Sequence, residues 1–260
     1  MSIQTKVADF FKKEFKEAPS LFIAPGRINM IGEHTDYNDG FVMPTAIDKH
    51  FVFAIAKSES ESFTIHALDL NEKISFSRNE LKPGHGWQNY LMGVIDGFIR
   101  RGKIPGGVNC AFSSNIPVGA GLSSSAALDS GFGFALNELF GLGLSRLDLA
   151  KIAQESEHNF VGAKVGIMDM YASLFSRKDS VMLLDCRNYK HEYRPLKFEH
   201  HEILLIDTKV KHSLASSAYN KRREACEEGV KKLQRHFKNV NALRDVSLTM
   251  LEKIKSEVNE

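Results

Sequence analysis

One strand–loop–helix segment limits the possible folds of this chain more than any other. NIPVGAGLSSSAAL, residues 115–128, follows a predicted strand at 108–113 and opens a helix of mostly small residues at 124–140. When a loop leads from a strand into a helix, the unpaired backbone N–H groups and the positive end of the helix dipole lie together at the helix N-terminus, where an anion binds well. Gly131 and Gly133 lower the intrinsic stability of this helix, so we expect it to pack closely against a neighbour.

The loop combines glycines with hydroxyl groups. Gly119 and Gly121 let the backbone approach phosphate oxygens, and the serines at 123–125 add hydrogen-bond donors or a magnesium ligand. No lysine follows, as it would in GxxxxGK[ST], and a serine replaces the third glycine of GxGxxG. The sequence predicts a nucleotide-phosphate site, with a glycine turn and a serine helix cap as the alternative interpretation.

The next predicted helix carries a carboxylate on its apolar face. It begins at the cap Ser145, with Asp148 three residues later. Glu157 shares a face with four apolar residues, Ala150, Ala153, Phe160 and Val161. A carboxylate that points inward needs a partner, and Mg²⁺ held together with a hydroxyl and nucleotide phosphates would supply one. A partly exposed glutamate at the helix end is the alternative.

The rest of the pattern mixes strands and helices without a regular βαβ alternation, so we predict an α+β fold. An amphipathic N-terminal helix has Val7, Phe10, Phe11 and Phe15 on one face, and a second helix is expected at 87–102. Further strands are expected at 21–24, 51–57, 63–68, 181–185 and 203–207, before a charged helical end. A polar turn at 176–180 is the best candidate for a domain boundary.

Composition and charge exclude several classes of protein. The 34 lysines and arginines against 32 acidic residues give a net charge of +2, which lacks the concentrated positive charge of a nucleic-acid-binding domain. No apolar run approaches the roughly 20 residues that span a bilayer, so we expect no membrane role. The three cysteines form no CxxC pair, which argues against a disulfide framework and favours a cytoplasmic location.

Four segments together resemble the galactokinases of the GHMP small-molecule kinase superfamily. They are PGRINMIGEHTDYN at 25–38, PVGAGLSSSAAL at 117–128, GIMDMYAS at 166–173 and HSLASSAYNKRREACEEG at 212–229. The resemblance covers nearly all of the chain. It implies the two-domain GHMP kinase fold, with an N-terminal sugar- and ATP-binding domain at 1–176 and a partial C-terminal domain at 177–260.

The resemblance implies ATP-dependent phosphorylation of the anomeric hydroxyl of D-galactose by a monomer. Its catalytic pair corresponds to Arg27 and Asp169. The implied sugar-binding residues are Glu33, His34, Asp36, Gly166 and Tyr219. The implied ATP-binding residues are Trp87, Gly119, Gly121, Leu122, Ser123, Ser124 and Ser125. Ser125 and Glu157 correspond to the Mg²⁺ ligands, whereas a core aromatic is the alternative interpretation of Trp87.

The sequence departs from the family in two places. Met170 follows Asp169 where the family usually has glutamine, and a third glycine-rich motif of the second domain is absent from these 260 residues. The missing motif leads us to expect weakened or absent catalysis compared with longer relatives, whereas Met170 affects only the fine tuning of the site. A galactose- and ATP-binding sensor, an inactive fragment and an N-acetylgalactosamine kinase remain alternatives. The resemblance implies that the family's sensors have lost the small residues after the serines, so Ala126 and Ala127 favour the enzyme here.

Overall fold

A five-stranded sheet forms the base of the larger part of the molecule. The computed structural model describes residues 1–197, 202–206 and 218–257. The strand order is β1-β3-β6-β4-β5, and β4 and β6 are parallel whereas the other neighbours are antiparallel. The bounds are β1 Ser20–Asn29, β3 Pro44–Lys57, β4 Phe63–Ala67, β5 Glu72–Phe76 and β6 Val108–Ser114.

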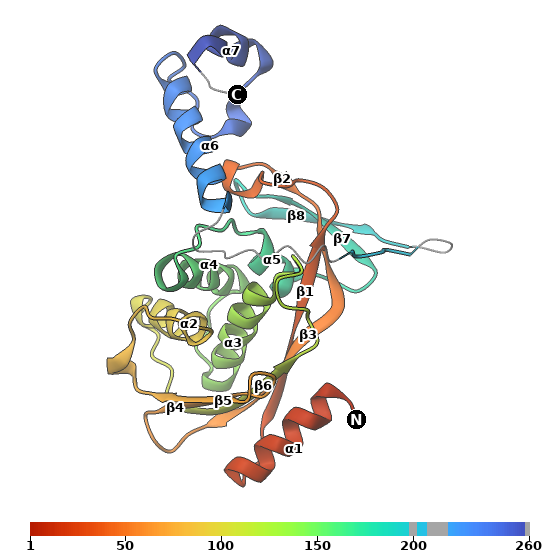
Figure 1. Ribbon diagram of the computed structural model, residues 1–260, viewed down its shortest axis with the longest axis vertical. Helices are drawn as coiled ribbons and strands as arrows, with labels where there is room; N and C mark the ends of the chain where they lie inside the picture. Colours follow the sequence, from red (N-terminus) through yellow and green to blue (C-terminus); the bar gives the residue numbers. More distant parts are fainter. Residues whose placement is uncertain (198–201, 207–217, 258–260) are drawn as a thin grey trace.

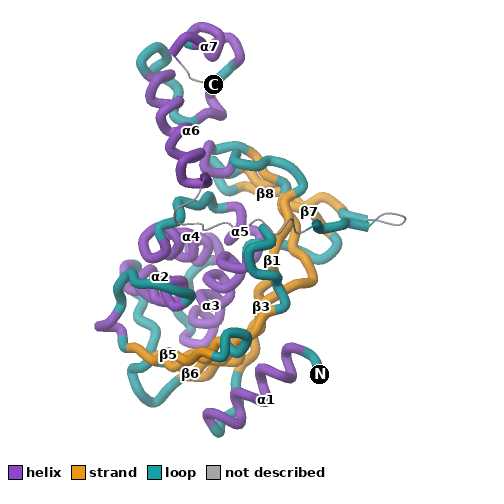
Figure 2. The backbone as a smooth tube through the Cα atoms, in the orientation of Figure 1, coloured by secondary structure: helices purple, strands orange, loops and turns teal. Residues whose placement is uncertain are grey.

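Helices cover both faces of this sheet unequally, as Figures 1 and 2 show. Four helices lie on one face: α2 Gln88–Arg100, α3 Ser124–Phe140, α4 Arg146–Ser156 and α5 Met168–Phe175. The single helix α1, Ile3–Phe15, lies on the other. The alternation of β3 explains both layers, because Phe53 and Ile55 enter the main core whereas Val52 and Ala54 pack under α1.

A second, three-stranded sheet has the order β2-β7-β8. Its strands are β2 Phe41–Val42, β7 Ser180–Asp185 and β8 Lys190–Pro195. The Thr45 hydroxyl donates to the carbonyl of Ser180 at 2.9 Å, which joins β3 to β7. The β1–β2 loop, residues 30–40, thus connects an edge strand of one sheet to a strand of the other. It contains the short helix η1, Asp36–Asn38.

The C-terminal helical arm, residues 218–257, extends beyond β2 and β8 at the end of the molecule farthest from α1 (Figure 1). It consists of α6 Ala218–Gln234, η4 Leu243–Asp245, α7 Leu248–Lys253 and η5 Lys255–Glu257. Leu233, Val240 and Ile254 form a small core of its own. Two further short helices, η2 Arg78–Glu80 and the π-helical turn η3 Glu157–Val161, lie in the main part.

Most of the expected strands and helices are confirmed, and the cap at Ser145 accepts the N–H of Asp148 at 3.1 Å as predicted. The strand expected at 203–207 is wrong over its described part, because residues 202–206 form a loop in which Leu204 is 80% exposed. Within the described ranges no strand pairs with it. Asp207 and residues 212–217 of the fourth family segment lie outside the described residues. The domain boundary near residue 176 stays a prediction.

None of the helices in the described ranges has both the length and the apolar character needed to cross a membrane.

Candidate active site

Arg27, Asp169 and Ser123 meet at the centre of the predicted site. Arg27 lies near the end of β1, and Asp169 lies in the first turn of α5. Arg27 Nε donates to Asp169 Oδ1 at 2.7 Å, and Ser123 Oγ donates to Asp169 Oδ2 at 2.6 Å. The side chains of the ion pair are 14% and 25% exposed, so solvent screens their attraction only in part. A cation, a carboxylate and the glycine–serine loop are therefore in direct contact.

The glycine–serine loop is attached to β1 at Gly26 and Arg27. The backbone N–H of Arg27 donates to the carbonyl of Leu122 at 3.2 Å, and Arg27 Nη1 donates to the carbonyl of Gly121 at 2.8 Å. A Cβ on Gly26 would lie 2.7 Å from the Leu122 oxygen, so only glycine permits this approach. Gly26 was not predicted as a supporting residue, although a Pro–Gly pair inside a strand signals such a bulge.

The loop reaches α3 through left-handed backbone conformations. Gly119 and Gly121 have φ values of +76° and +73°, and Ser123 has a φ of 57°. A Cβ on either glycine would meet no atom within 4 Å, so conformation and not space calls for glycine there. Because α3 begins at Ser124, its first unpaired N–H groups directly follow Ser123, the residue that contacts Asp169.

A second cluster combines the β1–β2 loop with α6. His34 Nδ1 is hydrogen-bonded to the Tyr37 hydroxyl at 2.6 Å, and its ring lies 5.3 Å from that of Tyr219. Glu33 accepts the side-chain N–H of Asn29 at 2.7 Å. The structure thus brings Tyr219 next to Glu33 and His34 at one end of β1, although Tyr219 is distant from them in the sequence.

Asp36 and Gly166 connect the two clusters. The backbone N–H of Gly166 donates to the Tyr219 hydroxyl at 3.2 Å, and that of Met168 donates to Asp36 Oδ2 at 3.4 Å. A Cβ on Gly166 would lie 1.7 Å from Asp36 Oδ2, so this contact requires glycine. Burial, and then the negative charge of Asp169, raise the pKa of Asp36 to about 6.

Glu157 is buried, as the apolar face of its helix predicted. Its side chain is 1% exposed, the Ser125 hydroxyl is hydrogen-bonded to it, and Oε2 has no partner within the described part of the chain. Burial raises its pKa to about 8. Asp129 on α3, which was not predicted, is fully buried with both carboxylate oxygens unpaired among the described residues, and burial raises its pKa well above the usual range.

An orphaned carboxylate oxygen beside a serine hydroxyl suits a hard cation such as Mg²⁺. Ser125 and Glu157 therefore fit the predicted pair of ligands. No group of three or more His, Cys, Asp or Glu side chains that could hold a metal exists in the ranges that the structure describes. The nucleotide phosphates would have to complete the coordination.

Trp87 and Met170 both contact the core. The Trp87 ring packs edge-to-face on Phe112 at 5.3 Å, and its N–H donates to Glu72 at 2.5 Å. This contact is the one that the core-aromatic interpretation expects, and an adenine contact stays a prediction. Met170 is completely buried in the main core, so the departure from glutamine changes core packing.

The fold and the glycine–serine loop define a class of protein, the GHMP small-molecule kinases. A family model described as "GHMP kinases N terminal domain" matches residues 89–177, and one described as "Galactokinase galactose-binding signature" matches residues 9–57. The mevalonate kinase of Methanococcus jannaschii shares the fold, with a TM-score of 0.56 and 21% identity over 71% of this chain and 57% of its own.

Within this class the chain belongs to the galactokinase family. It is 37% identical to the galactokinase of Clostridium beijerinckii over 100% of its own length and 68% of the relative's. It is 44% identical to that of Thermotoga maritima over 89% of its own length and 63% of the relative's. The crystal structure of Lactococcus lactis galactokinase complexed with galactose matches with a TM-score of 0.88 and 28% identity, over 100% of this chain and 68% of that one. The chain thus spans slightly less than two thirds of the Thermotoga relative.

Proposed function

We propose that this chain provides the galactose and ATP sites of a galactokinase, which transfers the γ-phosphoryl group of ATP to the anomeric hydroxyl of D-galactose. The observation that carries the proposal is the contact of Arg27 and Ser123 with the two oxygens of Asp169. Phosphoryl transfer requires mainly positioning and stabilisation of charge, and this contact brings a cation, a carboxylate and a phosphate loop together. The product is α-D-galactose 1-phosphate.

Asp169 is proposed to accept or polarise the proton of the anomeric hydroxyl, and Arg27 to stabilise the charge of the group in transfer. In the structure Ser123 donates to the same carboxylate. A phosphate group bound at the loop would offer Ser123 a second charged acceptor, which would compete with Asp169 for its hydroxyl proton. Release of Ser123 would then leave one Asp169 oxygen available to the sugar.

The cluster at the end of β1 is proposed to bind the sugar. Glu33, His34 and Asp36 would hydrogen-bond its hydroxyl groups, together with Tyr219 and the backbone at Gly166. A site built to bind hydroxyl groups discriminates strongly, because a ligand that lacks one leaves a buried polar group unpaired. The close contact between Gly166 and Asp36 supports this role, since it fixes the direction of the carboxylate.

ATP is proposed to bind along the glycine–serine loop. Gly119, Gly121, Leu122 and the serines at 123–125 would hold the phosphates, and Trp87 would contact the adenine. Mg²⁺ held by Ser125 and Glu157 would neutralise phosphate charge. The three cysteines are all free, which supports a cytoplasmic location, and we propose that the chain acts as a monomer.

A coupled ADP-release assay with galactose, together with thermal-shift titrations, tests the proposal. We expect galactose and Mg-ATP each to raise the melting temperature. Asp169→Asn should reduce any ADP release by about 100-fold or more while Mg-ATP still stabilises the chain. Asp179→Asn is the matched control, since Asp179 is exposed in a turn where asparagine also tolerates the φ of 54°.

The other outcomes identify the alternatives. Stabilisation by both ligands without ADP release would indicate a sensor or a catalytically incomplete chain. No stabilisation by either ligand would contradict the proposal. Faster turnover of N-acetylgalactosamine than of galactose would change the assigned substrate.

A further inference from the structure

We propose that Arg244 and Arg187 are positioning residues, which hold the β1–β2 loop in its ligand-binding conformation from the C-terminal helical arm. The inference rests on the proposed function for the identity of the ligand. The anchoring itself depends on contacts that involve no ligand.

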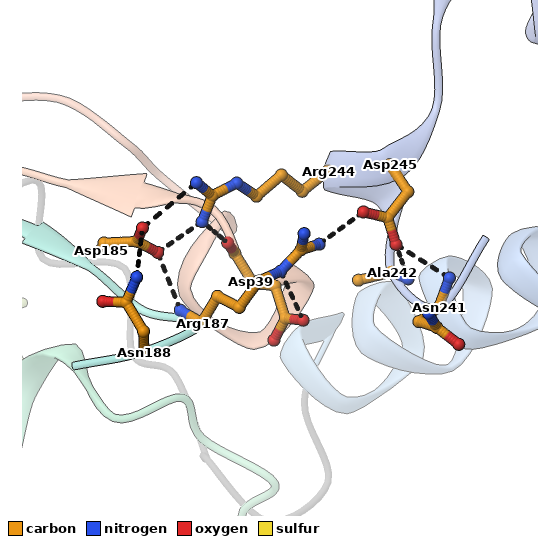
Figure 3. Close-up of polar contacts among 8 residues, drawn as sticks. All are labelled: Asp39, Asp185, Arg187, Asn188, Asn241, Ala242, Arg244 and Asp245. Atoms are coloured by element: carbon orange, nitrogen blue, oxygen red, sulfur yellow. Dashed lines mark hydrogen bonds and ion pairs between the residues drawn. The ribbon is translucent and has the colours of Figure 1, made fainter. Parts of the chain in front are cut away.

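Arg244 contacts the C-terminal end of the β1–β2 loop and the neighbouring strand β7 (Figure 3). It forms a bidentate ion pair with Asp185 at the end of β7, where Nη2 lies 3.1 Å from Oδ2. Its Nη1 also donates to the backbone carbonyl of Asp39 at 2.8 Å. The guanidinium carbon lies 4.2 Å from the ring centre of Phe41, which adds a cation–π contact. The Arg244 side chain therefore connects the arm to both the loop and β7.

Arg187 completes the connection from the opposite direction (Figure 3). It follows β7 and extends its guanidinium between the loop and the arm. Its Nη2 lies 2.6 Å from Asp245 Oδ1, and its Nε lies 3.3 Å from Asp39 Oδ2. Asp245 in turn accepts the backbone N–H groups of Asn241 and Ala242 at 2.8 and 3.1 Å, which fixes it within the arm.

The network is shielded from solvent around Arg244 but not at the Arg187–Asp39 pair, whose side chains are 39% and 43% exposed. The side chains of Asp185 and Asp245 are 16% and 17% exposed, and that of Arg244 is 26% exposed. Two arginines face three aspartates, so each arginine meets more than one acceptor. An isolated exposed ion pair contributes little to stability, whereas a bidentate pair within a network has a geometry that does stabilise the fold.

A shift at Asp39 would be transmitted to the proposed sugar-binding residues. Asp39 has a left-handed φ of 60° and directly follows η1, which begins at Asp36. The loop is closed by Thr35, whose carbonyl accepts the N–H of Gly40 at 2.8 Å and whose hydroxyl lies 2.7 Å from the carbonyls of Gly32 and Phe41. Because these hydrogen bonds tie residues 32–41 together, we expect the anchor at Asp39 to set the place of Asp36.

Hydrogen exchange of the unliganded chain tests the anchoring directly, and calorimetric titration with galactose and with Mg-ATP tests its effect. The variants are Arg244→Gln, Arg244→Lys and Arg187→Gln. Arg101→Gln is the matched control. Arg101 also forms a bidentate pair, with Glu155, and donates to a backbone carbonyl, that of Gly97, and its side chain is 23% exposed.

We expect faster amide exchange in residues 30–41 of Arg244→Gln and Arg187→Gln, but not of Arg101→Gln. If these two variants place the loop correctly in only about one molecule in ten, their dissociation constant for galactose rises about 10-fold relative to wild type. Their dissociation constant for Mg-ATP stays unchanged. Arg244→Lys should recover part of the loss, because it keeps the charge without the bidentate geometry. Should Arg244→Gln fail to fold, Arg187→Gln and Arg244→Lys carry the test.

Unchanged loop exchange in the variants would overturn the inference, as would an equal weakening of galactose and Mg-ATP binding, which indicates a general loss of structure. A wild-type chain that does not bind galactose, combined with faster loop exchange in the variants, would refute the proposed function and leave the anchoring supported.

Discussion

At the scale of single residues, the site depends on its glycines as much as on its charged side chains. Gly26 admits the carbonyl of Leu122, and Gly166 admits the carboxylate of Asp36. The charged residues of the site were proposed from the family motifs; the structure places Arg27 against Asp169, and the roles of these residues stay predictions. The Pro–Gly pair signals a bulge at Gly26, but neither the carbonyl that Gly26 admits nor the burial of Asp129 was predictable, because both depend on which distant groups pack there.

Galactose binding should depend on pH through Asp36. Its pKa of about 6 means that only about one tenth of the chains carry the ionised, hydrogen-bond-accepting form at pH 5. We expect the dissociation constant of galactose to be about 10-fold higher at pH 5 than at pH 7.5. Titration calorimetry of the wild type and of Asp36→Asn at both pH values measures this. The asparagine variant should show little pH dependence, and His34→Gln should retain it.

The same group has the opposite effect on stability. Its pKa is higher in the folded chain than its ordinary value of 3.8, so the folded state binds this proton more tightly than the unfolded state does. The stability that Asp36 contributes is therefore present below about pH 4 and is lost as the pH rises through 6. Asp36→Asn should raise the melting temperature relative to wild type more at pH 7.5 than at pH 4. An equal difference at both pH values would contradict the assigned pKa.

At the scale of helices and strands, buried elements were the easier ones to predict. The apolar alternation of β3 and the capped start of α4 gave strong signals. The strands β5 and β8 were missed because they are short, polar and at sheet edges, where few side chains enter the core. The apolar run at 203–207 predicts a strand, yet apolar character alone does not provide a partner strand, and its described residues 203–206 lie in a loop.

The glycines of α3 should respond differently to substitution. A Cβ on Gly131 would lie 2.5 Å from the Phe53 ring and 2.6 Å from Ala24, whereas one on Gly133 would lie 3.5 Å from Val94. We expect Gly131→Ala to destabilise the chain by about 1–3 kcal/mol through overpacking. Gly133→Ala should be neutral or stabilise it by up to about 1 kcal/mol, since alanine favours the helix. Urea denaturation of the two variants measures this, and similar effects would show that α3 can shift to relieve the contact.

At the scale of the whole molecule, the chain has a large core under the five-stranded sheet and a small one in the C-terminal helical arm. The arm core is formed by Leu233, Val240 and Ile254, and its members do not belong to the main cluster. The arm nevertheless contributes Tyr219, Arg223 and Arg244 to contacts with the loops around the site. The position of the arm was not predictable from its charged helical sequence, which indicates helices without showing where they pack.

Two core substitutions should separate these units. Leu136→Ala in the main core should lower the melting temperature of the whole chain by roughly 5–20 °C, the effect of losing about 2–5 kcal/mol. Ile254→Ala should accelerate hydrogen exchange across residues 218–257 and leave the main transition nearly unchanged. Differential scanning calorimetry combined with hydrogen exchange provides both readings. A full-size drop of the main transition in Ile254→Ala would show that the arm and the main core unfold together.

The attachment of the phosphate loop to β1 has a thermodynamic consequence. Arg27 hydrogen-bonds to the carbonyls of Gly121 and Leu122 and also to Asp169, so one residue touches the regions proposed for both substrates. Whatever factor Mg-ATP imposes on the dissociation constant of galactose, galactose must impose the same factor on that of Mg-ATP. Galactose and Mg-ATP can be titrated in either order. The sum of the two binding free energies must be the same whichever ligand binds first.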